Sequence, residues 1–147
     1  MRVCLTGGAG YIGSHILAGL LDDDHDVLVV DNFANSSPTS LDHVRQLAGR
    51  SFEILKEDIC HRAAMIDGLK DFRPEIVIHC AGLKAVGESQ KQPIRYYRTN
   101  VEGSISLLEA MDRAGCQRII FSSSATVYGT PHYLPYDEAH PVAPVNV

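Results

Sequence analysis

The chain has 147 residues, of which 45% are hydrophobic and 21% charged, as in one soluble globular domain with little room for a second. Eighteen acidic against thirteen basic side chains give a net charge of −5 without any basic block, which argues against nucleic acid as a partner. No apolar run approaches the ~20 residues of a membrane span and no signal peptide opens the chain, so we expect a cytoplasmic protein without a membrane partner.

Five short β-rich runs alternate with helical patterns along the chain. The runs cover residues 2–6, 26–31, 52–56, 75–80 and 117–123. Between them, apolar residues recur at helical spacing over 12–21, 41–47, 63–70 and 93–115. This order predicts an α/β fold, a Rossmann-like doubly wound parallel sheet of about five strands. Four prolines after Tyr128 predict a loop-rich tail.

The first and last predicted helices each carry a further feature. The first ends in three aspartates at 22–24, and because acidic groups oppose the helix dipole there, we expect a weakened helix end. The last runs from Pro93 to Gly115 and has an apolar stripe. That stripe can face the core or, in a homodimer of a longer parent protein, a second copy of the helix, and both readings stay open. Its members are Ile94, Tyr97, Val101, Ile105 and Leu108.

Four cysteines are too widely spaced to indicate a metal site or a disulfide framework. Cys4, Cys60, Cys80 and Cys116 form no Cys-x-x-Cys pair, and none of the seven histidines forms a ligand pair with another. We therefore expect no metal and four small, inert thiols.

A glycine-rich turn joins the first strand to the first helix. Residues 6–13 read Thr-Gly-Gly-Ala-Gly-Tyr-Ile-Gly and satisfy both G-x-G-x-x-G and G-x-x-G-x-x-G in the required strand–turn–helix context. Glycines there permit a tight turn and a close approach of backbone to a pyrophosphate, which the helix N-terminus then attracts. The residues assigned to this cofactor contact are Gly7, Gly10, Tyr11, Ile12 and Gly13.

Asp31 ends the second strand, eighteen residues after Gly13. A carboxylate at this place accepts hydrogen bonds from the ribose hydroxyls of adenosine and repels a 2′-phosphate, which favours NAD over NADP. Other polar residues at neighbouring strand ends are assigned to the ribose and the adenine edge. These are Asn32, Asn35, Ser36, Asp58 and Ile59.

Three segments of the chain resemble one family. Residues 6–15 resemble the start of the extended short-chain dehydrogenase/reductases. Residues 79–89, His-Cys-Ala-Gly-Leu-Lys-Ala-Val-Gly-Glu-Ser, resemble the fourth-strand segment of the UDP-glucose 4-epimerases within that group. Residues 121–129, Phe-Ser-Ser-Ser-Ala-Thr-Val-Tyr-Gly, resemble their fifth-strand segment. The resemblance extends over the whole chain and corresponds to the N-terminal, NAD-binding part of such proteins.

The resemblance implies an enzyme that inverts C4 of a UDP-hexose, such as UDP-glucose or UDP-galactose, through a 4-keto intermediate. NAD supplies the hydride chemistry, and the protein supplies positioning and electrostatics. Ser124 has an implied catalytic role, a hydrogen bond to the sugar hydroxyl at the reacting carbon. The resemblance further implies cofactor contacts from Cys80, Ala81, Gly82, Lys84, Asn100 and Ser122, and substrate contacts from Lys84 and Ser124.

The family's catalytic Tyr-x-x-x-Lys motif does not occur in this sequence, because none of the six tyrosines is followed by lysine four residues later. The resemblance places that motif shortly after Val147. We therefore expect residues 1–147 to be an NAD-binding Rossmann domain, incomplete at its C-terminal end and without the substrate-binding part. Two alternatives remain: a non-catalytic NAD-binding module, and a nucleotide-sugar dehydratase or decarboxylase of the same superfamily.

Overall fold

The computed structural model describes residues 1–146, which alternate between strands and helices. The elements in chain order are β1 (Arg2–Thr6), α1 (Tyr11–Asp22), β2 (Asp26–Val30), α2 (Pro38–Ala48), β3 (Glu53–Leu55), α3 (Arg62–Phe72), β4 (Ile76–His79), α4 (Val86–Lys91), α5 (Pro93–Tyr97), η1 (Arg98–Glu102), α6 (Gly103–Ala114), β5 (Ile119–Phe121) and η2 (Ala125–Tyr128). The sequence predicted all five strands and the main helices, but not the short helix α4.

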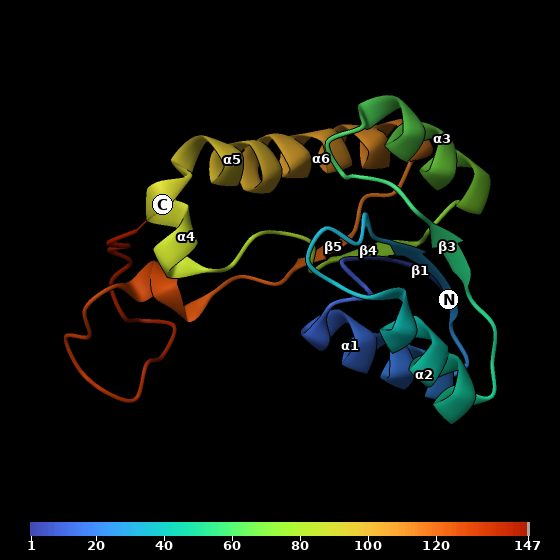
Figure 1. The fold of residues 1–147 in the computed structure, drawn as a ribbon, viewed down its shortest axis with the longest axis horizontal. Helices are drawn as coiled ribbons and strands as arrows, with labels where there is room; N and C mark the ends of the chain where they lie inside the picture. Colours follow the sequence, from blue (N-terminus) through green and yellow to red (C-terminus); the bar gives the residue numbers. More distant parts are fainter. Residues whose placement is uncertain (147) are drawn as a thin grey trace.

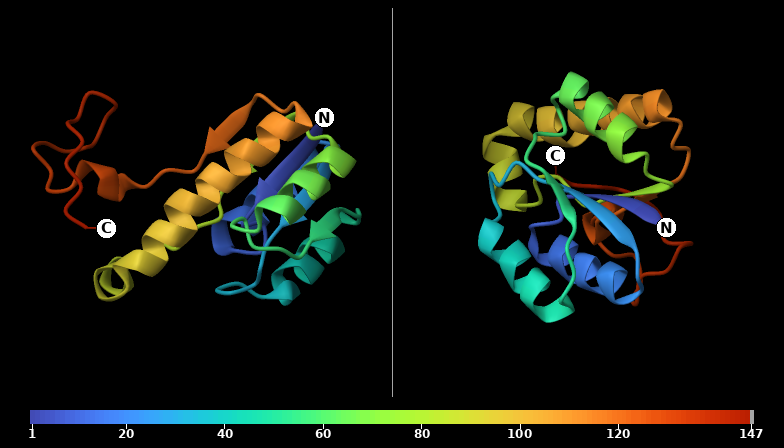
Figure 2. Two further views of the ribbon diagram at one scale, coloured as in Figure 1. Left: turned by 90° about the horizontal axis from the view of Figure 1, so that it is seen from above. Right: turned by 90° about the vertical axis from the view of Figure 1, so that its right-hand side faces the viewer.

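The five strands form one parallel sheet in the order β3-β2-β1-β4-β5. Helices α1 and α2 cover one face, and α3 and α6 cover the other (Figure 1; Figure 2, right). The order reverses between β1 and β4, where Thr6 lies beside His79. In such sheets, ligands bind at this switch point, outside the carboxyl ends of the strands. The predicted doubly wound fold is confirmed.

Two hydrophobic clusters hold the layers to the sheet. One lies under α3 and α6 and includes Cys4, Val77 and Leu107, and the other lies under α1 and α2 and includes Leu5 and Val29. Neighbouring residues of β1 thus serve opposite clusters, since successive side chains of a strand point to opposite faces. This explains why the central strands are apolar throughout.

Helix α1 is buried along Gly13, Leu17 and Leu21. Ile12, which begins the predicted four-residue repeat, has 57% of its surface exposed. It lies in the first turn, at the carboxyl edge of the sheet, where no core covers it. The helix was predicted, but its buried face follows Gly13, Leu17 and Leu21, one residue later along the chain than the repeat that begins at Ile12.

Arg50 compensates for the aspartates at the end of α1. Its guanidinium donates to the carbonyl oxygen of Leu21 at 2.6 Å and forms an ion pair with Asp24 at 2.8 Å. Asp24 has φ 60°, in the left-handed region that favours glycine. The chain leaves the helix through bonds from the Asp24 and His25 N–H groups to Leu21 and Leu20 carbonyls.

The left-handed conformation of Asp24 leads to a stability prediction. Asp24→Gly and Asp24→Ala remove the same carboxylate and the same ion pair, so they differ only in backbone preference. We expect the glycine variant to be about 1 kcal/mol more stable than the alanine variant, because a Cβ is unfavourable at positive φ. Urea unfolding of the two variants measures the difference, and equal midpoints would contradict the local geometry.

The long predicted helix is one run of three segments, α5, η1 and α6, which ends at the left-handed cap Gly115. Its middle segment η1 is a π-helical turn, which sequence periodicity did not predict. The apolar stripe from Ile94 to Leu108 lies on the surface rather than in the core, with exposed fractions between 48% and 74%. In Figure 1, this run lies along the top of the molecule, on the side of the sheet opposite to α1 and α2.

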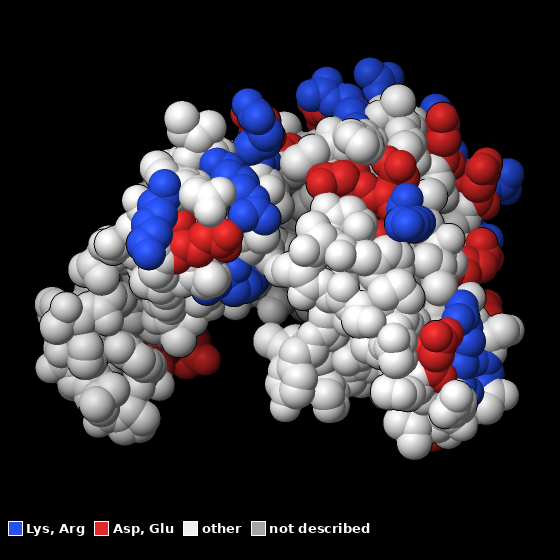
Figure 3. Space-filling view, in the orientation of Figure 1, with Lys and Arg blue, Asp and Glu red and all other residues white. Residues whose placement is uncertain are grey.

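The tail after β5 is mostly loop, as its prolines predict, with one short helical turn, η2. Positive and negative side chains are interspersed over the face shown in Figure 3, without one continuous basic patch. Among residues 1–146, no helix has the length and apolar character needed to cross a membrane.

Candidate functional site

The glycine turn after β1 is shaped by its contacts with two other strands. Gly7 has φ 71°, and its N–H donates to the carbonyl of Val30 at 2.8 Å. A Cβ at Gly7 would lie 2.6 Å from the backbone nitrogen of Ala81. A Cβ at Gly13 would overlap the carbonyl oxygen of Gly7. The backbone of this turn, the helix and the loop after β4 therefore approach each other as only glycine permits.

The N-terminus of α1 opens from this turn. Gly10 precedes the helix without a side-chain cap, and the first turn contains no acidic residue. The unpaired N–H groups and partial positive charge of a helix start attract an anion. Tyr11 and Ile12 are exposed there, so the helix start is accessible.

Asp31 connects the glycine turn to the loop that follows β2. The side chain is buried, with 8% exposed, and its carboxylate accepts hydrogen bonds from the N–H groups of Ala9 and Phe33 at 2.9 Å. It also accepts from the Ser36 hydroxyl at 2.8 Å. Two carboxylate oxygens offer about four lone-pair positions, so capacity for a further donor remains. Asp31 thus shapes the site while retaining the capacity to bind a ribose hydroxyl.

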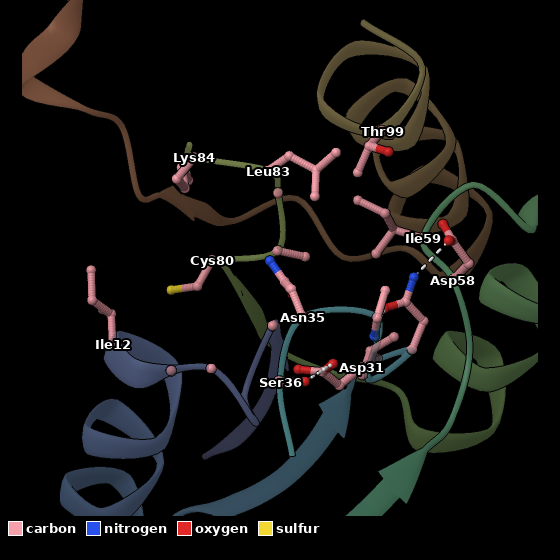
Figure 4. Close-up of a pocket in the computed structure, with 18 of the residues that line it drawn as sticks. Ile12, Asp31, Asn35, Ser36, Asp58, Ile59, Cys80, Leu83, Lys84 and Thr99 are labelled. Carbon is pink, nitrogen blue, oxygen red and sulfur yellow. Dashed lines mark hydrogen bonds between the residues drawn. The ribbon is translucent and has the colours of Figure 1, made fainter. Parts of the chain in front are cut away.

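Asp58 holds the far side of the site. Burial alone would raise the pKa of its carboxyl, but hydrogen bonds from Cys60 and Asn32 hold that pKa below its ordinary value. The Asn32 amide donates to it at 2.7 Å, which ties the loop after β2 to the loop after β3 (Figure 4). Asp58 is therefore an anion that keeps this wall in place at neutral pH.

The loop after β4 forms the opposite wall. Asn100, in the π turn, accepts from the N–H of Leu83 at 2.8 Å and donates to its carbonyl at 2.9 Å. Lys84 donates to the carbonyl oxygen of Ser122 at 3.3 Å, at the end of β5. Burial raises the pKa of the Cys80 thiol. This wall therefore presents one cation and a neutral thiol to the site.

These groups enclose a cavity of about 440 Å³ at the carboxyl edge of the sheet. Figure 4 shows Asp31 and Ser36 below and Lys84 and Leu83 above. Ile12 and Cys80 lie on one side, and Asp58, Ile59 and Thr99 lie on the other. Of the residues predicted for the cofactor, the cavity is lined by Gly7, Gly10, Tyr11, Ile12, Gly13, Asp31, Asn32, Asn35, Ser36, Asp58, Ile59, Cys80, Ala81, Gly82, Lys84 and Ser122.

Two predicted site residues lie outside the cavity lining. Asn100 acts behind the wall, through Leu83. Ser124 caps the turn η2, where its hydroxyl accepts from the N–H of Thr126 at 3.3 Å. Sequence reasoning missed six lining residues. Five of them adjoin predicted residues along the chain, whereas Arg95 reaches the cavity only because α5 folds over it. The six are Val30, Ala34, Glu57, Leu83, Arg95 and Thr99.

Fold and site together define a protein of the dinucleotide-binding Rossmann class. The glycine cradle and the open helix start suit a pyrophosphate, and the buried Asp31 suits a ribose. Residues 3–147 match the family model described as the NAD dependent epimerase/dehydratase family. The chain belongs to this family.

Individual relatives agree with that membership. The chain is 51% identical over 146 residues to the UDP-glucose 4-epimerase of Mus musculus. The aligned region covers 95% of this chain and 42% of the relative. It thus spans about two fifths of the length of the curated relatives it matches.

Solved structures give the same picture. A UDP-glucose 4-epimerase from Stenotrophomonas maltophila with bound NAD and formylated UDP-arabinopyranose superposes with TM-score 0.96 at 40% identity, over 99% of this chain and 44% of that one. One from Bifidobacterium longum in complex with NAD+ and UDP superposes with TM-score 0.95 at 44% identity, over 97% and 43%.

Proposed function

We propose that this chain is the NAD-binding part of a UDP-glucose 4-epimerase. The observation that carries the proposal is the single cavity that joins the glycine turn, Asp31 and Lys84 at the switch point of the sheet. The 51% identity to an epimerase of that name supports the substrate class, a UDP-hexose. In this proposal, most of the sugar-binding residues and the Tyr-x-x-x-Lys motif belong to further chain, so we expect residues 1–147 to bind NAD without turnover.

In this role, the residues of the chain bind and orient the cofactor. The glycine turn and the N-terminus of α1 hold the pyrophosphate, and Asp31 accepts from the adenosine ribose. Lys84 places a positive charge on the wall opposite α1. NAD, when bound, accepts and returns a hydride at C4 of the sugar. Ser124 is proposed to contact the sugar hydroxyl.

Binding of NAD and NADP to the Asp31→Asn variant tests the proposal. We expect the unaltered chain to prefer NAD, because the Asp31 carboxylate repels a 2′-phosphate. The variant should lose about tenfold or more in NAD affinity, since one charged hydrogen bond contributes about 1.5–3 kcal/mol. Its ratio of NADP to NAD affinity should rise, and calorimetric titration measures both.

Asp26→Asn is the matched control, because Asp26 is exposed at the other end of the same strand. It should leave both affinities unchanged. Equal binding of NAD and NADP by the unaltered chain would contradict the role of Asp31, and absence of NAD binding would overturn the proposed function.

We also propose that the protein forms a homodimer through the stripe on α5–η1–α6. The stripe is symmetric about Val101: Ile94 and Leu108 stand seven residues either side of it, and Tyr97 and Ile105 four residues either side. An antiparallel copy related by a twofold axis at Val101 therefore matches Ile94 with Leu108 and Tyr97 with Ile105. Such self-complementarity is what a twofold interface requires.

Sedimentation velocity tests the dimer. Ile105→Glu should convert it to monomer, because the substitution places a carboxylate beside Tyr97 of the other copy. Leu47→Glu is the control, since Leu47 is 82% exposed on α2 and lies away from the stripe. A monomeric unaltered chain, or an unchanged mass for Ile105→Glu, would exclude this interface.

The four free thiols support a further proposal, that the protein works in the cytoplasm. Reducing compartments keep thiols unpaired. Burial, and next the neighbouring Cys116, raises the pKa of the Cys4 thiol to about 12, and burial raises that of Cys60 to about 11. These thiols are therefore inert at neutral pH, as expected from the sequence.

A further inference from the structure

A continuous chain of hydrogen bonds lies behind the cavity wall, between the sheet and the long helix. Its centre is His79, the last residue of β4, which is buried with 3% exposed. The ring nitrogen Nδ1 lies 2.6 Å from the Thr6 hydroxyl oxygen, and Nε2 lies 3.0 Å from that of Ser104. The Ser104 hydroxyl donates to the carbonyl oxygen of Asn100 at 2.6 Å. The N–H of Ala81 donates to the Thr6 hydroxyl oxygen at 3.3 Å.

The two ends of this chain determine where each proton lies. The Asn100 carbonyl only accepts, so the Ser104 hydroxyl proton points toward it, and the Ser104 oxygen accepts from Nε2–H of His79. With its proton on Nε2, a neutral imidazole has a lone pair on Nδ1, which accepts from the Thr6 hydroxyl. The Thr6 oxygen in turn accepts from Ala81. Each donor therefore has one acceptor when His79 is neutral and carries its proton on Nε2.

Both ends of this series of hydrogen bonds reach the loop that follows β4. At one end, Ala81 belongs to the cavity lining. At the other end, the Asn100 side chain holds the N–H and the carbonyl of Leu83. Lys84 follows directly and also lines the cavity, whereas His79 does not. The ring of His79 is further held by Phe121, with a centroid distance of 5.3 Å and an edge-on angle of 61°.

We propose that His79 is a positioning residue for the cofactor site, which as a neutral Nε2–H imidazole sets the place of residues 81–84 from both sides. It acts through Thr6 on Ala81, and through Ser104 and Asn100 on Leu83. The inference rests on the proposed NAD binding. Burial of the ring, and next the charge of Lys84, lower the pKa of His79 to about 4, in agreement with a neutral ring.

The most direct test interrupts the series of hydrogen bonds at a residue outside the cavity lining. Ser104→Ala removes one link without touching the lining, and Ser106→Ala is its matched control on the same helix. Ser104 is half-buried and Ser106 is buried, and the Ser106 hydroxyl has no hydrogen-bond partner among the described residues. We expect Ser104→Ala to weaken NAD binding about five- to tenfold at unchanged fold, and Ser106→Ala to leave it as it is.

Substitutions of His79 itself separate the contribution of its hydrogen bond to Thr6 from that of its hydrogen bond to Ser104. His79→Gln places an amide near the position of Nε2 and keeps a donor for Ser104, whereas His79→Asn places one near Nδ1 and keeps an acceptor for Thr6. His79→Leu keeps neither. We expect the leucine variant to bind NAD least and each amide variant to restore part of the affinity, with folding checked by circular dichroism.

Nuclear magnetic resonance gives two readouts that do not depend on NAD. Long-range ¹⁵N spectra should show His79 protonated on Nε2, and amide shifts of residues 81–84 should move in Ser104→Ala but not in Ser106→Ala. A proton on Nδ1, unmoved shifts, or equal NAD affinities of the two serine variants would overturn the inference. Absence of NAD binding by the unaltered chain, with shifts that move as expected, would overturn the proposed function alone.

Discussion

Gly13→Ala should largely abolish the stability of the fold and, with it, NAD binding. An alanine Cβ at this position would overlap the carbonyl oxygen of Gly7 and lie 2.8 Å from the Cα of Gly8. Neither group can move away freely, because the Gly7 N–H is bonded to Val30 of the neighbouring strand. Overpacking of this kind costs about 1–3 kcal/mol, and more where only backbone can yield, so we expect a loss of about 3 kcal/mol or more in urea unfolding.

Gly19→Ala in the same helix should have the opposite effect. Gly19 is exposed, and a Cβ there meets nothing within 4 Å. Alanine is favoured over glycine inside a helix by about 0.8–1 kcal/mol, so this variant should be more stable than the unaltered chain. If both alanine variants changed stability by the same amount, close backbone approach at Gly13 would not be the reason that this position is glycine.

Stability should fall as the pH is lowered from about 6.5 to about 4, through His79. Its pKa is lowered from 6.5 to about 4 in the folded chain, by burial of the ring and then by the charge of Lys84. In this range, the unfolded chain binds a proton that the folded chain does not, so acid favours unfolding. The difference of about 2.5 pKa units corresponds to about 3 kcal/mol in the free energy of unfolding. This contribution is fully present above about pH 6.5 and is lost by about pH 4.

Urea unfolding between pH 4 and pH 8 measures this effect as a difference between variants. His79→Gln cannot take up the proton and should show a flatter pH dependence than the unaltered chain. His43→Gln is the control, because His43 is exposed on α2, and it should keep the full dependence. Parallel curves for His79→Gln and the unaltered chain would show that a neutral His79 does not contribute to stability.

Local motifs accounted for most of the candidate site. The glycine turn and Asp31 are recognisable from residue type and spacing, because they do their work through backbone conformation and strand position. Asn35, Ser36 and Ile59 were found because residues at the carboxyl ends of parallel strands gather at one edge of the sheet. Cys80, Ala81, Gly82 and Lys84 were found by resemblance, since no spacing rule marks them.

Other features of the site depend on contacts between distant segments. Arg95 is one: its guanidinium forms an ion pair with Glu88 at 2.8 Å, and only the fold of α5 against α4 brings it to the cavity. The π turn at Asn100 is another, because helical periodicity does not distinguish it from an ordinary turn. Sequence alone also left the stripe at Val101 undecided, since a surface seam and a buried face have the same spacing.

The sequence by itself determined the class of fold, a doubly wound parallel sheet, and the glycine cradle with its acidic partner Asp31. Each follows from local preference: apolar strands, helical repeats and positions where only glycine fits. The tertiary structure determined which residues meet across the sheet. The chain from Thr6 through His79 to Ser104 joins residues up to 98 positions apart. Its hydrogen bonds exist only once β1, β4 and the long helix are packed together, because no local pattern places those groups within reach.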